Sequence, residues 1–373
     1  MDLTPLFKER SDYLPEFILF PNEIVGLLDK HIIGQEKAKR VLGIALFLRS
    51  LRMLQSQGTI NLLAPLNKHN ILMVGPTGCG KTALMRAIAE TMDILVTITD
   101  VSGITSAGYV GGDIDDIINL HLHNAHERVQ RRAKGYETMS QMKQELDIEM
   151  KFGVVYLDEF DKCRKDLGGY GKDINGQSVQ QELLKLLEGE EISYRNDRQK
   201  GELKTFDCSE TLFICGGAYV GLDKIVLERL NKKVGIGFSH EGTRQMEANS
   251  DILDHLTNED LEKYGFLPEV LGRLTTCAVL KELTIDNLVT IINNENNGLI
   301  KEYTSFFDLF DVKVEFDEYA VKEIATIVKE NKVGARGLRS VILKILEEYQ
   351  YNIQSIAPKQ RLIITKEDVR NSL

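Results

Sequence analysis

Residues 70–82 read NILMVGPTGCGKT, an apolar run that leads into a glycine-rich loop. The loop fits the pattern GxxxxGK[ST], and apolar residues at helical spacing follow it at Leu84, Ala87 and Ile88. In this order of strand, loop and helix, backbone N–H groups curl around phosphates and the helix N-terminus adds positive potential. The stretch therefore predicts an α/β fold with a parallel sheet and a site for nucleotide phosphates.

The glycine-rich loop supplies most of the expected nucleotide contacts. We expect the cofactor-binding residues to include Gly75, Pro76, Thr77, Gly78, Cys79, Gly80, Lys81 and Thr82. The ammonium group of Lys81 would reach the outer phosphates, and the hydroxyl of Thr82 would bind Mg²⁺. A glycine loop without a ligand is the alternative, and the strand and helix patterns on either side argue against it.

A second apolar run, at residues 154–157, ends in Asp158 and Glu159. We expect Asp158 to hold Mg²⁺ and Glu159 to activate the attacking water, so both are predicted catalytic residues together with Lys81. Acidic residues also occur simply as strand ends. After a phosphate-binding loop, however, the adjacent pair indicates a hydrolytic site.

The composition is that of an ordinary globular chain. Its 373 residues are 43% apolar and 27% charged, which allows about two domains. The net charge of −10 disfavours binding of nucleic acid or of an anionic membrane surface. The N-terminal stretch is too charged for a signal peptide, and no segment reaches transmembrane length.

The five cysteines form no CxxC pair, so we predict no zinc site and a reducing, cytoplasmic location. His121, His123 and His126 have the look of a metal cluster. Positions i and i+2 of a helix point to different sides, however, so a solvated helix face explains these histidines better than a metal site does.

Further apolar runs at residues 94–99 and 212–215 alternate with helical patterns, which is typical of a parallel sheet covered by helices. Ser178 and Gln181 have the spacing of a capping box and predict a helix that begins there. The buried face of that helix is expected at Val179, Leu183, Leu186 and Leu187.

The last quarter of the chain changes character. Helical patterns are predicted at residues 285–292, 321–328 and 338–345, with Gly334 as the C-cap between the second and the third. Short apolar segments at 312–316 and 362–365 are expected to add a strand or two. We therefore predict an α/β ATPase domain at residues 1–281 and a small, mainly helical domain at residues 282–373.

The adjacent acids also separate classes of nucleotide-binding protein. They suit hydrolysis by water, whereas a metabolic kinase needs an acceptor pocket and a lid. Switch GTPases usually carry Asn-Lys-x-Asp, and the nearest string, at residues 67–70, precedes the loop and lacks the Asp. A motor is therefore favoured. Arg273 and Arg336 would supply its γ-phosphate contacts, one from a neighbouring subunit and one from the small domain, although each taken singly is explained as a surface arginine.

The ordered set of motifs resembles the ClpX subfamily of AAA+ protein unfoldases, from about Leu19 to the C-terminus. Besides the glycine-rich loop, the matching strings are IGQ at 33–35, AGYVG at 107–111, VYLDEFDK at 155–162, VQQ at 179–181, LFICGGA at 212–218, IGF at 236–238, PEVLGRL at 268–274 and GARGLRS at 334–340. Their number and order make the resemblance highly specific.

The resemblance implies a ring homohexamer that uses ATP and Mg²⁺ to unfold protein substrates and feeds them to a ClpP-type peptidase ring. It implies nucleotide contacts from Ile33 and Arg336. It implies a substrate-gripping pore loop at Gly108, Tyr109, Val110 and Gly111, and a peptidase-docking string at Ile236, Gly237 and Phe238. A core position is the alternative for the tyrosine, and the flanking glycines favour a loop tip.

The chain departs from the family pattern in three places. The amino-terminal zinc-binding domain usual in this family is expected to be missing, and the basic Arg-Lys-His loop is not found between Gly189 and Phe206. The segment 119–152 is longer than the family pattern and rich in charge. We therefore make no prediction of which substrates, adaptors or degradation tags the protein recognises.

Rival functions come from neighbouring classes. HslU shares the Gly-Tyr-Val-Gly loop but carries a larger insertion than this chain does. A DNA-remodelling motor would line its channel with Lys and Arg, and the net charge of −10 argues against such a motor. A stand-alone chaperone or remodelling ATPase that acts without a peptidase stays open as the alternative.

Overall fold

The computed structural model describes residues 18–60, 64–104, 113–132, 138–165, 174–196, 202–233, 252–294, 299–356 and 361–372. The chain divides into two compact units, and each is described by itself. Unit 1 comprises residues 1–28, 36–74 and 82–279. Unit 2 comprises residues 29–35, 75–81 and 280–373, so two short segments from the N-terminal part of the chain join its C-terminal part.

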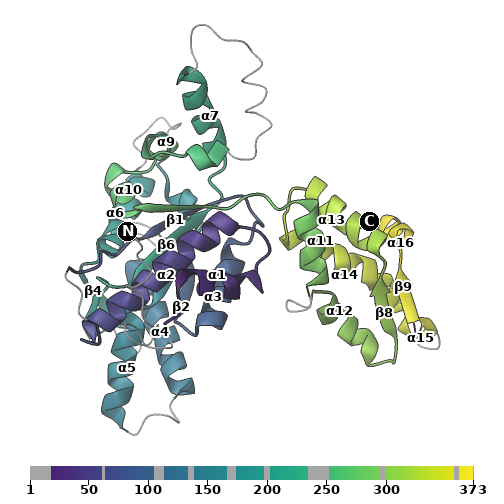
Figure 1. Ribbon diagram of the computed structural model, residues 1–373, viewed down its shortest axis with the longest axis horizontal. Helices are drawn as coiled ribbons and strands as arrows, with labels where there is room; N and C mark the ends of the chain where they lie inside the picture. Colours follow the sequence, from purple (N-terminus) through teal and green to yellow (C-terminus); the bar gives the residue numbers. More distant parts are fainter. Residues whose placement is uncertain are drawn as a thin grey trace, which may run out of the picture. The chain divides into compact units, whose positions relative to one another are not determined.

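Unit 1 is built on a five-stranded sheet, drawn in Figure 1. The strands, in their order across the sheet, are β2 (Val96–Asp100), β3 (Val154–Asp158), β6 (Leu212–Gly217), β1 (Ile71–Val74) and β7 (Thr276–Val279). Every neighbouring pair is parallel. Every residue of the central strands β1 and β6 is buried, because helices cover both faces of the sheet. The prediction of an α/β fold with a parallel sheet is confirmed.

The helices of unit 1 precede these strands or lie between them along the chain, singly or in groups. They are α1 (Pro21–Asp29), α2 (Glu36–Ser56), α3 (Lys81–Met92), α4 (Ile114–Arg131), α5 (Met139–Lys151), η4 (Phe160–Cys163), α6 (Ile174–Glu188), α7 (Leu222–Lys233), η6 (Ile252–His255), α9 (Asn258–Tyr264) and α10 (Pro268–Arg273). The predicted capping box at Ser178 is wrong, because α6 begins upstream at Ile174 and Ser178 lies within it. The predicted buried face of that helix is confirmed, since Val179, Leu183, Leu186 and Leu187 all lie in the core.

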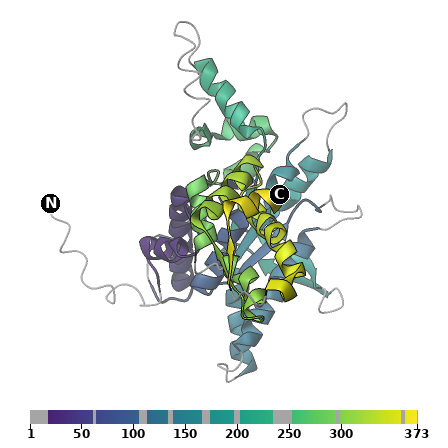
Figure 2. The ribbon, with the colours of Figure 1, turned by 90° about the vertical axis from the view of Figure 1, so that its right-hand side faces the viewer.

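Two hairpins extend from the sheet of unit 1. Helices α4 and α5 pack side by side, as the views in Figures 1 and 2 both show. Each begins with a capping box, at Asp113 for α4 and at Thr138 for α5. The second hairpin pairs β4 (Glu191–Asn196) with β5 (Glu202–Asp207) in antiparallel fashion.

Unit 2 is mainly helical. Its elements are α11 (Ile285–Asn293), α12 (Leu299–Asp308), β8 (Lys313–Phe316), α13 (Glu318–Glu330), α14 (Arg336–Tyr351), α15 (Ile353–Ile356), β9 (Arg361–Ile364) and α16 (Lys366–Ser372). The expected helical stripes form one apolar core, and the two expected short strands pair in parallel. The prediction that Gly334 caps the middle helix is wrong. Asn331 caps α13, and Gly334, at a φ of 60°, instead packs against Gly78.

Candidate functional site

The acidic pair lies at the carboxyl edge of the sheet in unit 1. Asp158 is the last residue of β3, and β1, which leads into the glycine-rich loop, ends at the same edge because all the strands are parallel. Helix α3 follows the loop and brings Thr82 to β3, where its hydroxyl donates a hydrogen bond of 3.0 Å to Asp158 Oδ2. The sequence predicted both residues as Mg²⁺ ligands, and the structure brings them together.

Asp158 has hydrogen-bond donors on both of its oxygens. Besides Thr82, the hydroxyl of Tyr156 donates to Oδ1 at 3.2 Å, and the backbone N–H of Glu159 donates to the same oxygen at 2.9 Å. Tyr156 is fully buried on β3, and its hydroxyl lies so close to Gly216 that a Cβ there would be 2.1 Å away. Hydrogen bonds to both of its oxygens therefore hold the Asp158 carboxylate in one orientation.

Glu159 has a strained, left-handed backbone conformation. Its φ is 56°, in the left-handed region that non-glycine residues rarely adopt. Its side chain is 41% exposed and forms an ion pair with Lys162, one turn further on. The turn at the end of β3 therefore presents the Glu159 carboxylate to solvent while it keeps Asp158 in the sheet edge.

The glycine-rich loop at residues 75–81 belongs to unit 2 and is tightly curled. Gly78 has a φ of 76° and Gly80 a φ of 102°, both of which favour glycine. The ammonium group of Lys81 is buried, and it donates to the carbonyl oxygens of Gly75 at 2.6 Å and of Pro76 at 3.0 Å. Lys81 thus turns back over the loop in which phosphates are expected.

Neighbouring segments of unit 2 fix the shape of this loop. The backbone N–H of Ala335 donates to Gly78 O at 3.0 Å. The side-chain amide of Gln35 donates to Cys79 O at 3.0 Å and to Lys281 O at 2.8 Å, and Gln35 Oε1 accepts from Lys281 N at 2.8 Å. Gln35 therefore ties three distant stretches of the chain together. Burial raises the pKa of the Cys79 thiol, so Cys79 stays protonated and fills space in the loop.

The residues present suit a nucleotide triphosphate with a divalent cation. A hydroxyl and a carboxylate whose oxygens meet at 3.0 Å are the kind of ligand that Mg²⁺ prefers, and a bound cation would take the place of the hydrogen bond between them. A buried ammonium at the start of helix α3 suits phosphate oxygens. A Cβ on Gly75 would lie 2.8 Å from atoms of Leu280, so only glycine leaves the loop in this path.

The two further predicted nucleotide contacts lie in unit 2 beside the loop. Ile33 is half-buried and precedes Gly34, which has a φ of 71° and packs against Asn287. Arg336 is exposed at the first position of α14, next to the residue that bonds Gly78. Each residue therefore stands next to or near a residue that bonds the loop, Gln35 for Ile33 and Ala335 for Arg336, and their contacts with nucleotide stay a prediction.

Arg273 lies at the end of α10 in unit 1. Its side chain is 52% exposed and pairs with Glu188 at 3.1 Å, while its backbone carbonyl accepts a hydrogen bond from Asn70 at the entrance to β1. An exposed guanidinium held at its base in this way suits contact with a neighbouring molecule, and its action in trans stays a prediction.

Some predicted residues lie outside the part of the chain that the structure describes. These are the pore-loop residues Gly108, Tyr109, Val110 and Gly111 and the docking residues Ile236, Gly237 and Phe238. Conversely, sequence reasoning gave no role to Tyr156, Lys162 and Gln35, although each stands inside a matched string. The partners of Gln35 lie 44 and 246 positions away, so a local pattern carries no signal for it, whereas Tyr156 and Lys162 bond residues of their own string, Asp158 and Glu159.

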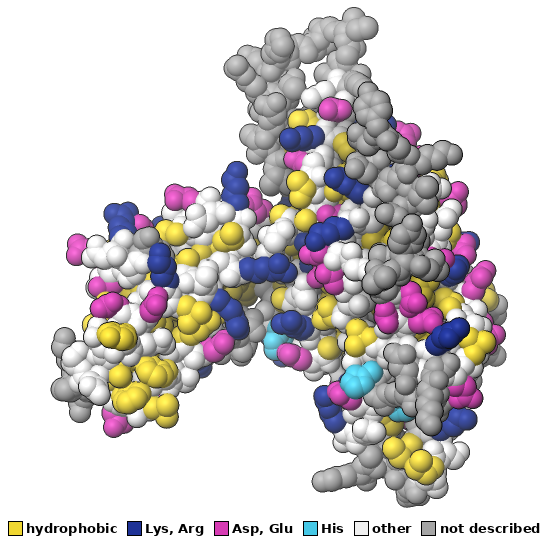
Figure 3. All heavy atoms as spheres, turned by 180° about the vertical axis from the view of Figure 1, so that it is seen from behind, with side chains coloured by type: hydrophobic (Ala, Val, Ile, Leu, Met, Phe, Trp, Pro, Cys, Tyr) yellow, Lys and Arg dark blue, Asp and Glu magenta, His cyan; other side chains and the backbone are white. Residues whose placement is uncertain are grey.

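On the face shown in Figure 3, basic and acidic side chains are interspersed over the described residues. Within the described ranges, no group of three or more His, Cys, Asp or Glu is placed to hold a metal, and no helix is both long and apolar enough to cross a membrane. The expectation of a solvated helix face is wrong for His121, which is buried, bonds Thr97 and the carbonyl of Met150, and has its pKa lowered to about 4 by burial.

A Gly78→Ala variant is expected to lose nucleotide affinity by about tenfold or more, which corresponds to about 1.4 kcal/mol. An alanine there would hold a left-handed backbone, which costs about 1–2 kcal/mol, and its Cβ would meet Val333 O at 2.4 Å. Gly58→Ala is the control, because Gly58 has a similar φ of 71° but no neighbour within 4 Å. Nucleotide titrations and melting curves that coincide for the two variants would contradict this account.

Comparisons with known proteins agree with this geometry. The family described as AAA domain (Cdc48 subfamily) matches residues 66–277. A protein from Treponema denticola named "ATP-dependent Clp protease ATP-binding subunit ClpX" is 34% identical over 98% of this chain and 83% of its own length. Proteins of the same name from Borrelia duttonii and Borrelia recurrentis are each 33% identical, with the same coverage. The chain is therefore an ATP-hydrolysing member of the ClpX family of AAA ATPases.

Proposed function

We propose that this ATPase unfolds protein substrates and feeds them to a ClpP-type peptidase. The observation that carries the proposal is the union of Thr82, Asp158 and Glu159 at one sheet edge, in a chain aligned over 98% of its length with ATP-binding subunits of Clp protease. An adjacent acidic pair suits transfer of the γ-phosphoryl group to water, and hydrolysis of that kind drives a motor.

In this proposal the nucleotide residues divide the work between binding and water activation. Bound Mg²⁺ would supply positive charge at the phosphates, held through Thr82 and Asp158. Lys81 binds the outer phosphates, Glu159 orients a water molecule and takes its proton, and Arg336 follows the small domain toward the nucleotide. The fixed carboxylate of Asp158 and the exposed carboxylate of Glu159 suit these different tasks.

The motor is proposed to act as a homohexamer. Arg273 would then reach the γ-phosphate of the neighbouring subunit, and Tyr109 and Val110, flanked by Gly108 and Gly111, would press on an extended chain in the ring's channel. We propose an ATPase domain at residues 1–281 and a small domain at residues 282–373. All five cysteines are free thiols, which supports a reducing, cytoplasmic location.

A stand-alone chaperone is the second candidate, because its nucleotide site would have the same geometry. The test is ATP-dependent unfolding of a tagged, folded reporter by the purified chain, with and without a ClpP-type peptidase ring. Loss of reporter structure together with faster degradation supports the proposal. Unfolding without any effect of the peptidase points to the chaperone, and brisk ATP hydrolysis without unfolding contradicts both.

A Phe238→Ala variant is expected to lower peptidase-coupled degradation by about 30-fold and to leave unfolding unchanged. An aromatic anchor in a docking cleft contributes about 2 kcal/mol or more to binding, and Phe238 is the aromatic residue of the docking string. The measurement compares degradation and unfolding of one reporter. An equal loss of both activities, or a loss of neither, argues against a docking role for Phe238.

A further inference from the structure

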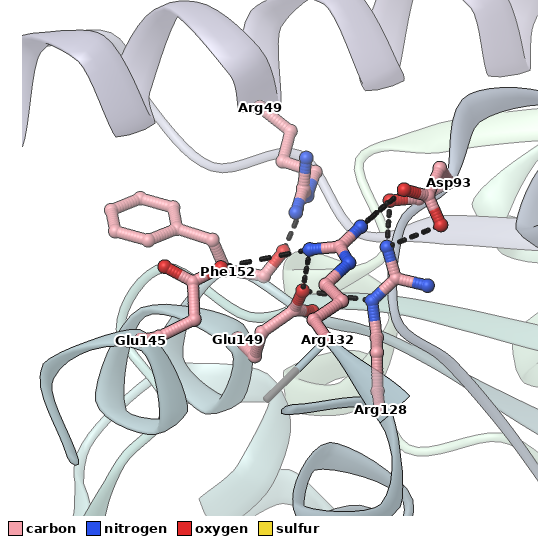
Figure 4. Close-up of polar contacts among 7 residues, drawn as sticks. All are labelled: Arg49, Asp93, Arg128, Arg132, Glu145, Glu149 and Phe152. Carbon is pink, nitrogen blue, oxygen red and sulfur yellow. Dashed lines mark hydrogen bonds and ion pairs between the residues drawn. The ribbon is translucent and has the colours of Figure 1, made fainter. Parts of the chain in front are cut away.

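Helix α3 connects the nucleotide loop with a cluster of charges at its other end. It begins at Lys81 and Thr82 and ends at Met92, and Asp93 follows with a φ of 48°. The carbonyl groups at a helix C-terminus have no intrahelical partners and carry negative potential, so they attract cations. Two arginines, Arg128 at the end of α4 and Arg132 just after it, occupy this position (Figure 4).

Asp93 is held through both its backbone and its side chain. Arg128 donates to Asp93 O and pairs with Asp93 Oδ1 at 2.9 Å. Arg132 donates to Asp93 O at 3.2 Å and pairs with Asp93 Oδ2. Burial raises the pKa of the Asp93 carboxyl, but the charge of Arg128 and the hydrogen bond from Arg132 outweigh burial and lower the net pKa. The Asp93 carboxylate is therefore charged at neutral pH and loses its ion pairs only in acid, as the pH falls through its depressed pKa.

The same guanidinium groups are held on their other side by α5. Arg128 Nε lies 2.8 Å and Arg132 Nη1 3.1 Å from Glu149 Oε1, and the Glu149 side chain is only 9% exposed. Arg132 also pairs with Glu145 at 3.6 Å. We call Asp93, Arg128, Arg132 and Glu149 the helix clamp. Each arginine in it bridges the end of α3 to α5, so neither can shift without breaking contacts on two elements.

Helix α4 is fixed at its other end and in its middle as well. Near its start, Asp115 accepts the backbone N–H of Arg195 at 3.0 Å, and Asn119 donates to Arg195 O at 2.8 Å, so α4 holds strand β4. In its middle, His121 bonds Thr97 of β2 at 2.7 Å and Met150 O of α5 at 3.0 Å. A Cβ on Gly153 would lie 2.4 Å from the His121 ring, which leaves α4 no slack there.

Helix α4 is thus a rigid element of about 27 Å, from its 18 residues and a rise of about 1.5 Å each. It starts directly after residues 105–112, which hold the predicted gripping string, and it ends in the helix clamp on α3. We propose that the helix clamp is a positioning device that makes the gripping loop follow the nucleotide-dependent movement of α3. This inference rests on the proposed function.

Thermodynamic stability is not what the clamp chiefly provides. At the Asp93 end of the clamp, Asp93 is 74% exposed and Arg132 35%, and exposed ion pairs contribute little to folding, whereas the Arg128–Glu149 pair is largely buried. Four contacts that converge from both arginines on Asp93 instead fix its direction relative to α4. A device that fixes an angle between helices should affect the coupling of two sites more than it affects melting.

The test uses the full chain with Asp93→Asn and Arg132→Gln variants. Asparagine tolerates the left-handed backbone of Asp93 and lacks the charge. Arg131→Gln is the matched control, because Arg131 lies on the same helix, is 79% exposed and pairs only locally with Glu127 among the ion pairs of the described residues. Hydrogen exchange of peptides covering residues 105–119 is compared between ADP and a non-hydrolysable ATP analogue, together with ATP hydrolysed per reporter unfolded.

The wild type and Arg131→Gln are expected to show a nucleotide-dependent difference in exchange at residues 105–119, and both clamp variants are expected to lose it. Their ATP hydrolysis should stay within about twofold of the wild type, while ATP used per unfolded reporter rises about 2- to 30-fold. The inference is overturned if the clamp variants keep the exchange difference, or if the wild type lacks it. Failure of the wild type to unfold any reporter, with the exchange result intact, contradicts the proposed function alone.

Discussion

A Glu159→Gln variant is expected to bind ATP with unchanged affinity and to hydrolyse it at least about 100-fold more slowly. Glutamine has nearly the shape of glutamate but cannot accept a proton from water. The groups that would hold the cation do not depend on the Glu159 side chain. Asp158 accepts hydrogen bonds from the hydroxyls of Thr82 and Tyr156, and Glu159 contributes its backbone N–H but not its side chain. Binding and turnover should therefore separate in this one variant.

The measurement pairs fluorescent-nucleotide titration with phosphate release. Lys162→Gln is the control, because it removes the ion pair of Glu159 and leaves the carboxylate in place. That control should hydrolyse ATP within a few-fold of the wild type, since an exposed ion pair is worth about 1 kcal/mol or less. Wild-type turnover by Glu159→Gln would remove Glu159 from water activation.

An Arg273→Ala variant is expected to lose ATP hydrolysis by about 1,000-fold or more, because an arginine at the transferring phosphoryl group contributes a factor of that size. Its own nucleotide binding should persist. The guanidinium is 52% exposed and pairs with Glu188 at the end of α6, so it is presented outward from unit 1. We expect its catalytic effect on a neighbouring subunit.

Mixed assemblies distinguish action in trans from action in the same subunit. Wild-type and Arg273→Ala chains are combined in varied ratios, and ATP hydrolysis is followed. Activity that falls below the straight line between the two pure samples indicates that a variant subunit disables its neighbour, whereas a strictly linear dependence contradicts it. Glu188→Gln is the control. It removes the ion pair but leaves the positive charge of Arg273 in place, so this variant should retain most of the ATP hydrolysis.

Local patterns were sufficient to predict the framework of the nucleotide site. Strand β1, the loop and helix α3 are contiguous in sequence, so their spacing identified Lys81 and Thr82 directly. Asp158 was predicted from its place after an apolar run, and in a parallel sheet that place brings it to Thr82. The helical stripes of the C-terminal part were recognised because their apolar residues recur within single helices.

Contacts between distant segments were not predictable from such patterns. Gln35 bonds residues 44 and 246 positions away, and nothing in its own neighbourhood shows it. Gly334 was mistaken for a helix cap because its conformation suits one, whereas its neighbour is Gly78. The start of α6 was misplaced because the spacing of Ser178 and Gln181 also occurs inside a helix.

The composition of unit 2 has a consequence for how the protein is made. The glycine-rich loop takes its hydrogen bonds from Gln35 on one side and from Ala335 on the other, and Gln35 is itself secured by Lys281. A ribosome releases the N-terminal part first, so the loop is synthesised long before Lys281 and Ala335 emerge. Nascent chains that end before residue 280 therefore carry the whole motif and Gln35 but neither Lys281, which secures Gln35, nor Ala335, and the capacity to bind ATP should mature late in translation.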